Sequence, residues 1–170
     1  MVQSRLTSIS ARLDRISDGL CSVASCLLLV MVGLINVEVL LRYGFQTSTL
    51  IADEYSGYLF VWLTLLGFAH ALRSDAFIRV EVLVDRCGVR ARAACEALSS
   101  IIGLLVVGVL AYAGWLHFAG SFHFGSRSIQ PSSTPLWCVQ IAVPLGLGWL
   151  CLLYTDALIR SFARWTRGTR

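Results

Sequence analysis

The chain contains no lysine, so its 14 basic residues are all arginines. Acidic residues are also few, and all charged residues together make up only 14% of the sequence. Hydrophobic residues reach 56%, and the mean hydropathy is +0.72. Since soluble domains carry about 25% charged residues, this composition argues against a soluble enzyme. The net charge of +4 does not indicate nucleic-acid binding either, because the arginines flank apolar runs and form no single basic patch.

Residues that build metal, haem or catalytic sites are scarce or badly spaced. The six cysteines include no C-x-x-C pair, so we expect neither a zinc site nor a structural disulfide. His117 and His123 lie at the end of one apolar run and His70 near the opposite end of another, so no pair is placed to sandwich a haem iron. We recognise no nucleophile with a neighbouring base and no glycine-rich phosphate loop. The sequence therefore predicts no cofactor, no metal and no enzymatic activity.

Four long apolar runs occupy most of the chain, at residues 20–41, 55–72, 97–119 and 136–159. About 20 apolar residues are needed to cross the hydrocarbon core of a membrane as a helix. The sequence therefore predicts an all-α integral membrane protein, with one domain of four transmembrane helices over residues 1–170. The first run is too long for a signal peptide and is not followed by a small-residue cleavage site, so we expect it to be a span.

The arginines are concentrated on one side of these spans. Twelve of them fall before the first run, between the second and third, or after the fourth, and these segments share one side of a membrane crossed four times. Only Arg42 and Arg127 fall on the other side. Positive charge near span ends is retained in the cytoplasm, so both termini and the middle loop are predicted to be cytoplasmic. The twelve are Arg5, Arg12, Arg15, Arg73, Arg79, Arg86, Arg90, Arg92, Arg160, Arg164, Arg167 and Arg170.

Two segments outside the runs are predicted to lie flat in the cytoplasmic membrane interface. Over residues 1–19, apolar residues recur every three or four positions, which is the pattern of an amphipathic helix. A coiled-coil seam is the alternative, but fewer than three heptads precede the first span. Over residues 77–86 a shorter apolar face is interrupted by charges, which favours a second interfacial segment. The first stripe consists of Val2, Leu6, Ile9, Leu13, Ile16 and Leu20.

Prolines and small residues predict where helices bend and approach one another. Pro135 is expected at the start of the fourth span, where a missing N–H costs nothing, and Pro144 is expected to kink that span. Small residues four positions apart let helix backbones come close in lipid. Such pairs occur on the second, third and fourth runs, as Gly67 with Ala71, Ser99 with Gly103, and Ala142 with Gly146.

Four charged residues gather near the outer ends of the first two spans. Glu38 and Arg42 are one helical turn apart, so they can neutralise each other. Asp53 and Glu54 open the second span, where carboxylates are favoured by the unpaired N–H groups of a helix N-terminus. We expect a cluster of three or four of these side chains to tie the two spans together. A transport site is the alternative, but all four residues can lie near the interface rather than mid-membrane.

With these segments in order, the chain resembles the small membrane subunit of tripartite ATP-independent periplasmic (TRAP) transporters, the DctQ-like family. The family pattern is an arginine and an aromatic residue ending span one, an acidic pair and an aromatic stretch in span two, and then a basic, amphipathic segment. Leu50, Ile51, Phe77 and Glu81 depart from that pattern. The matching residues are Arg42-Tyr43, Asp53-Glu54, Tyr58 to Trp62, Gly67-Phe68-Ala69, Ala71-Leu72-Arg73, Ile78 to Glu81, Ser133 to Trp137 and Val143 to Gly146.

The resemblance implies a non-catalytic scaffold in the bacterial inner membrane. Such a subunit works with a large DctM-like permease and a periplasmic DctP-like substrate-binding protein, importing an organic acid, typically with sodium. Substrate and sodium ligands belong to the large subunit, so none is assigned here. Arg127 is a candidate contact for a periplasmic partner. The candidates for structural or assembly roles are Glu38, Arg42, Asp53, Glu54, Trp62 and Arg73.

Two other functions remain open at this stage. A stand-alone transporter of the small multidrug type also has four helices and a membrane-embedded glutamate, for which Glu38 is the candidate. The nearby Arg42 and the one-sided arginine distribution argue against it. A membrane subunit of an oxidoreductase is the other alternative, which the histidine spacing weakens.

Overall fold

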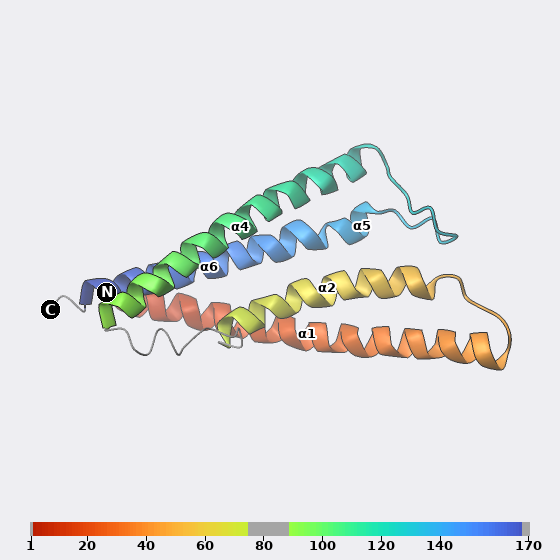
Figure 1. Ribbon diagram of the computed structural model, residues 1–170, viewed down its shortest axis with the longest axis horizontal. Coiled ribbons are helices and arrows are strands. Elements are labelled where there is room, and N and C mark those ends of the chain that lie inside the picture. Colours follow the sequence, from red (N-terminus) through yellow and green to blue (C-terminus); the bar gives the residue numbers. More distant parts are fainter. Residues whose placement is uncertain (1, 75–88, 168–170) are drawn as a thin grey trace.

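The computed structural model describes residues 2–74 and 89–167, with side-chain surroundings for residues 11–74 and 94–162. The predicted interfacial segment at 77–86 lies outside these residues. The described chain is helical throughout apart from its loops, and one isolated antiparallel bridge joins Arg127 and Pro135. Its helices are α1 (Val2–Gly44), α2 (Ala52–Arg73), α4 (Val89–His123), α5 (Trp137–Gln140) and α6 (Ala142–Arg167), as Figure 1 shows.

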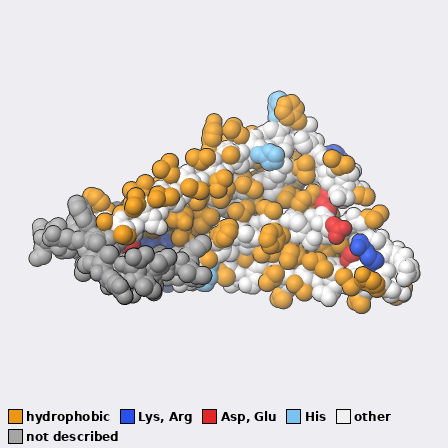
Figure 2. Space-filling model, in the orientation of Figure 1, with side chains coloured by type: hydrophobic (Ala, Val, Ile, Leu, Met, Phe, Trp, Pro, Cys, Tyr) orange, Lys and Arg blue, Asp and Glu red, His pale blue; other side chains and the backbone are white. Residues whose placement is uncertain are grey.

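Four helical stretches are long and apolar enough to cross a membrane, which confirms, for the described residues, the prediction of a helical fold with four helices of span length. Each stretch extends past the corresponding apolar run at one end or both. Leucines at the surface of α1 and α4 stay largely exposed, and hydrophobic side chains cover most of the visible helical surface (Figure 2). Such a surface is stable against lipid tails but not against water. The stretches are Ala11–Gly44, Ala52–Arg73, Ala94–His123 and Trp137–Phe162.

The first helix differs from the prediction, because α1 continues without a break through the expected boundary at residue 20. No proline lies in this part of the chain, and Gly19 alone does not end the helix. Leu13 and Leu20, two residues of the predicted amphipathic stripe, pack against a buried cluster of α2 and α6 side chains. At least this part of the stripe therefore faces the protein. The placement of the first 19 residues in the membrane interface stays a prediction.

The helices pack as two antiparallel pairs placed side by side. α1 packs against α2, α4 packs against α6, and α2 packs against α6 to join the pairs (Figure 1). α1 begins and α6 ends at the same end of the molecule, which we call the terminal end. The opposite end, which we call the loop end, carries the loop at 45–51 and the loop at 124–136.

Three glycines stand where helices approach each other closely. A Cβ atom at Gly146 of α6 would lie 2.7 Å from the Cβ of Leu65 in α2, and one at Gly114 of α4 would lie 2.7 Å from Cγ1 of Val143. Gly103 lies against the ring of Tyr154. The predicted small residues at Gly103 and Gly146 therefore do stand at helix contacts. Gly67 does not, because a Cβ there would meet open space.

The fourth span is interrupted near its start. α5 ends at Gln140, and α6 begins at Ala142 after a break at Ile141. Pro144 has no N–H to donate to the carbonyl of Gln140, and the next bond runs from the N–H of Leu145 to the carbonyl of Ile141 at 3.3 Å. The interruption thus falls about one turn before Pro144, where its missing donor acts.

Candidate functional site

Glu38 holds the first loop at the loop end. This residue is only 6% exposed, although it carries a carboxylate near the end of α1. Its two oxygens accept hydrogen bonds from the hydroxyls of Ser48 and Thr49 at 2.5 Å each and from the backbone N–H of Thr49 at 3.1 Å. A buried carboxylate is costly unless it is paired and hydrogen-bonded. The loop thus supplies the donors that Glu38 needs, and Glu38 in turn fixes the loop.

The backbone of this loop adopts unusual conformations at two positions. Gln46 and Leu50 have positive φ angles of 50° and 57°, which side-chain-bearing residues rarely adopt. The hydroxyl of Ser48 also accepts a hydrogen bond from the N–H of Leu50 at 3.2 Å. Surrounding contacts must over-determine such conformations for them to persist. For Leu50 those contacts are the bonds to Ser48 and, through Ser48 and Thr49, to Glu38. For Gln46 they are the bonds from the N–H groups of its neighbours Phe45 and Thr47 to the carbonyl of Leu41.

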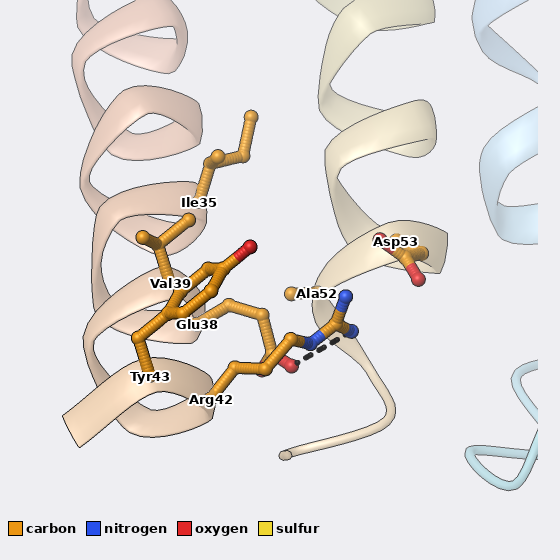
Figure 3. Close-up of a pocket in the computed structure, with 7 residues that line it drawn as sticks. All are labelled: Ile35, Glu38, Val39, Arg42, Tyr43, Ala52 and Asp53. Carbon is orange, nitrogen blue, oxygen red and sulfur yellow. Dashed lines mark hydrogen bonds and ion pairs between the residues drawn. The ribbon is translucent and has the colours of Figure 1, made fainter. Parts of the chain in front are cut away.

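Arg42 and Asp53 share a small pocket with Glu38 beside this loop. The cavity of about 200 Å³ is also lined by Ile35, Val39, Tyr43 and Ala52. Arg42 forms an ion pair with Glu38 at 3.3 Å, and Figure 3 shows its guanidinium extending toward the start of α2, where Asp53 lies. Three of the four charged residues predicted to cluster are therefore brought together.

Glu54, the fourth residue of the expected cluster of three or four, does not line that pocket. It is buried, and its carboxylate accepts hydrogen bonds from the hydroxyls of Tyr58 and Ser132. Adjacent residues of an α-helix point about 100° apart, so Asp53 and Glu54 face different neighbours. Glu54 ties α2 to the loop at 124–136, and not to α1.

A second charged cluster lies at the terminal end and joins three helices. The Arg73 side chain is 8% exposed and lies between the carboxylates of Asp14 in α1, at 3.1 Å, and Asp156 in α6, at 3.0 Å. Asp156 also pairs with Arg160 at 2.8 Å. A ring nitrogen of His70 in α2 lies 3.0 Å from the carboxylate of Asp18 in α1.

The sequence analysis found Arg73 but not its partners. Asp156 is the only acidic residue in the fourth apolar run, and an ionisable residue in a span is by default a candidate with a partner. That signal was sufficient to single it out. Trp62 is partly buried in α2, and Arg127 is exposed in the loop at 124–136, so neither joins the two clusters.

These charged side chains connect helices and loops of the chain to one another. Glu38 connects α1 to the first loop, Glu54 connects α2 to the second loop, and Arg73 connects α1, α2 and α6. Within residues 2–74 and 89–167, no group of three or more His, Cys, Asp or Glu side chains is arranged to hold a metal ion.

Comparison with known proteins agrees with the resemblance noted in the sequence. Residues 31–164 match the family described as tripartite ATP-independent periplasmic transporters, DctQ component. The chain is 30% identical over 92 residues to a Haemophilus influenzae protein named as a TRAP transporter small permease, covering 54% of this chain and 57% of that protein.

Two further relatives are named C4-dicarboxylate TRAP transporter small permease protein DctQ. The one from Rhodobacter capsulatus is 28% identical over 113 residues, covering 66% of this chain and 49% of that protein. The one from Pseudomonas aeruginosa is 28% identical over 107 residues, covering 60% of this chain and 50% of that protein. The chain thus spans about half the length of the curated relatives that it matches.

Proposed function

The chain belongs to the DctQ family of TRAP transporter components, and from this premise we propose that it is the small, non-catalytic scaffold subunit of such a transporter. As a member with four span-length helices, it is a multi-pass protein of the inner membrane. The observation that carries the scaffold role is that the buried charged side chains bind groups within this same chain. Glu38 and Glu54 accept hydrogen bonds from groups of this same chain, and Arg73 forms ion pairs with two of its carboxylates, so these contacts hold the subunit in shape.

In the proposed topology both termini are cytoplasmic and the loop end is periplasmic. The arginine distribution supports this orientation, because Arg42 and Arg127 are the only arginines at the loop end among the residues that the structure describes. The loops at 45–51 and 124–136 then face the compartment in which a substrate-binding protein would arrive.

The proposed partners are a large DctM-like permease and a periplasmic DctP-like binding protein, and the proposed cargo is an organic acid imported with sodium. Two relatives carry C4-dicarboxylate in their names, which makes dicarboxylates the first substrates to test. Glu38, Arg42, Asp53, Glu54, Trp62 and Arg73 are proposed as residues that keep the subunit competent for assembly.

Purification followed by reconstitution tests this function. A tagged chain should copurify with a much larger multispan protein, and vesicles should take up dicarboxylate only when both membrane subunits and the binding protein are present. Vesicles that contain this chain alone should transport nothing. Proton-coupled drug efflux by the chain alone would instead support the small multidrug type of transporter and would contradict the proposal.

A further inference from the structure

The pocket between the ends of α1 and α2 holds two opposite charges that do not pair with each other. Arg42 and Asp53 both line this cavity of about 200 Å³. Figure 3 shows Arg42 paired with Glu38, while its guanidinium extends toward the start of α2. Asp53 is exposed, and its carboxylate makes no hydrogen bond or ion pair within the described residues. A cation and an anion therefore face the same small space.

Both groups keep bonding capacity that a ligand can use. A guanidinium carries five N–H donors, and the contact of Arg42 with Glu38 at 3.3 Å involves one of its nitrogens. The Arg42 side chain remains 56% exposed. Glu38, in contrast, is already occupied by the hydroxyls of Ser48 and Thr49. Arg42 and Asp53 are thus the groups of this pocket that are open to a ligand.

An apolar stripe of α1 runs from the pocket along the span. Its residues recur at intervals of three and four positions, so they lie on one face of the helix. The apolar side chains of the stripe are 42–46% exposed, and two of them also line the pocket. In a helix that crosses a membrane, such a face meets lipid tails. The stripe consists of Leu28, Val32, Ile35 and Val39, and it ends at Arg42.

The pocket lies at the level of the lipid headgroups. Arg42 directly follows the first apolar run, and Asp53 lies in the first turn of α2 at the same end of the molecule. Headgroups occupy the layer just outside the hydrocarbon core. A lipid whose acyl chain follows the stripe therefore brings its headgroup to these two residues.

The charges of the pocket distinguish between headgroups. Glu38 and Asp53 give it two negative charges against the one positive charge of Arg42, so an anionic headgroup is disfavoured. A phosphocholine headgroup carries a cation but has no N–H group to donate to Asp53. A phosphoethanolamine headgroup offers a phosphate, which guanidinium groups bind well, and an ammonium that donates to a carboxylate.

We propose that this pocket binds a phospholipid with a phosphoethanolamine headgroup. The phosphate lies on Arg42, the ammonium on Asp53, and an acyl chain follows the stripe from Val39 to Leu28. The lipid thereby connects the end of α1 to the start of α2. This site goes beyond the scaffold function, because it depends on the span and not on the other subunits. In the proposed orientation the lipid belongs to the periplasmic leaflet.

Lipid binding to the full chain tests the proposal. The chain is purified in detergent and titrated with phosphatidylethanolamine, phosphatidylglycerol or phosphatidylcholine of the same acyl chains, and native mass spectrometry measures each Kd. Phosphatidylethanolamine should bind most tightly to the wild type. Asp53→Asn should raise its Kd about fivefold, as expected for the loss of one exposed ion pair, and should leave the Kd for phosphatidylglycerol unchanged or lower.

Two further variants separate the phosphate contact from a general effect of charge. Arg42→Gln should raise the Kd for phosphatidylethanolamine and phosphatidylglycerol alike, because both lipids carry the phosphate. The matched control is Arg127→Gln, which removes an exposed arginine that lies at the same end but does not line the pocket. The control should leave both Kd values unchanged.

Other occupants give different results. Free phosphoethanolamine lacks the acyl chain and should not displace the lipid at equal concentration, so displacement would assign the pocket to a small zwitterion and overturn the proposal. A photocrosslinking amino acid in place of Val39 should form an adduct with phospholipid in the membrane, and an adduct with a large permease would overturn it. Equal Kd values for the three lipids would also overturn it. Copurification with a large permease tests the scaffold function independently of these outcomes.

Discussion

Arg73 lies between carboxylates of two other helices, and this makes its charge hard to replace. Arg73→Gln should destabilise the purified subunit by about 3 kcal/mol, because Asp156 is left buried without its closest interhelical cation. Thermal unfolding followed by tryptophan fluorescence measures this loss. The matched control is Arg160→Gln, whose side chain is 41% exposed and whose ion pair should be worth at most about 1 kcal/mol. Equal stability of wild type and Arg73→Gln would show that the pair is not needed.

Glu38 and Arg42 form an ion pair, but their roles should differ. Glu38→Gln should increase hydrogen exchange at the Thr49 amide, because the weaker acceptor loosens the bonds that hold the first loop. Arg42→Ala should change that exchange much less, since Glu38 keeps its three bonds to Ser48 and Thr49. Exchange measured by mass spectrometry on the loop peptide distinguishes the two variants. The reverse order of effects would mean that Arg42, and not the loop, satisfies Glu38.

Among the helices, the contact between α2 and α6 depends on Gly146. Gly146→Ala should lower the stability of the subunit by about 1–3 kcal/mol, because the new Cβ would overlap Leu65 and force the helices apart. Gly67→Ala is the control, because its Cβ would enter open space and the exchange of glycine for alanine favours a helix. The midpoint temperature of thermal unfolding should fall for Gly146→Ala and rise for Gly67→Ala. Unchanged stability of Gly146→Ala would show that α2 and α6 adjust to the added methyl group at little cost.

The positions of these helices could be predicted because span length and apolar composition are local properties. The continuity of α1 could not, because the stripe of Leu13 and Leu20 suits a membrane interface and a protein neighbour equally well. A disturbance of the fourth span could be predicted from Pro144. It lies at Ile141 because the hydrogen bond that a proline cannot donate belongs to the preceding turn.

The partners of the charged residues were harder to predict. The Glu38–Arg42 pair follows from helical spacing, and it was found. The pairing of Arg73 with Asp156, and of Glu54 with Ser132, depends on how α2 is rotated against α6 and the loop at 124–136. That rotation is decided by contacts such as Gly146 on Leu65, between residues 81 positions apart. Local patterns carry no information about it.

For the whole molecule, the arginine distribution predicts a single orientation. Alkaline phosphatase fused after Arg170 should be inactive, and a fluorescent protein at the same site should be bright, because both report a cytoplasmic end. Alkaline phosphatase inserted at Gly125 in the second outer loop should be active. An active enzyme at the C-terminus would reverse the topology and would place the loop at 124–136 in the cytoplasm.

The ion pairs of Arg73 also impose an order on biosynthesis. The residue belongs to α2, but its buried partner Asp156 is made more than 80 positions later, in α6. Until that last helix enters the membrane, Arg73 lacks this buried partner, and the half-exposed Asp14 of α1 is the other carboxylate that pairs with it among the described residues. An unfinished or truncated chain therefore retains a poorly compensated charge near its second helix. Insertion of α6 supplies Asp156, so the finished subunit differs in the environment of this charge from intermediates that lack the last helix.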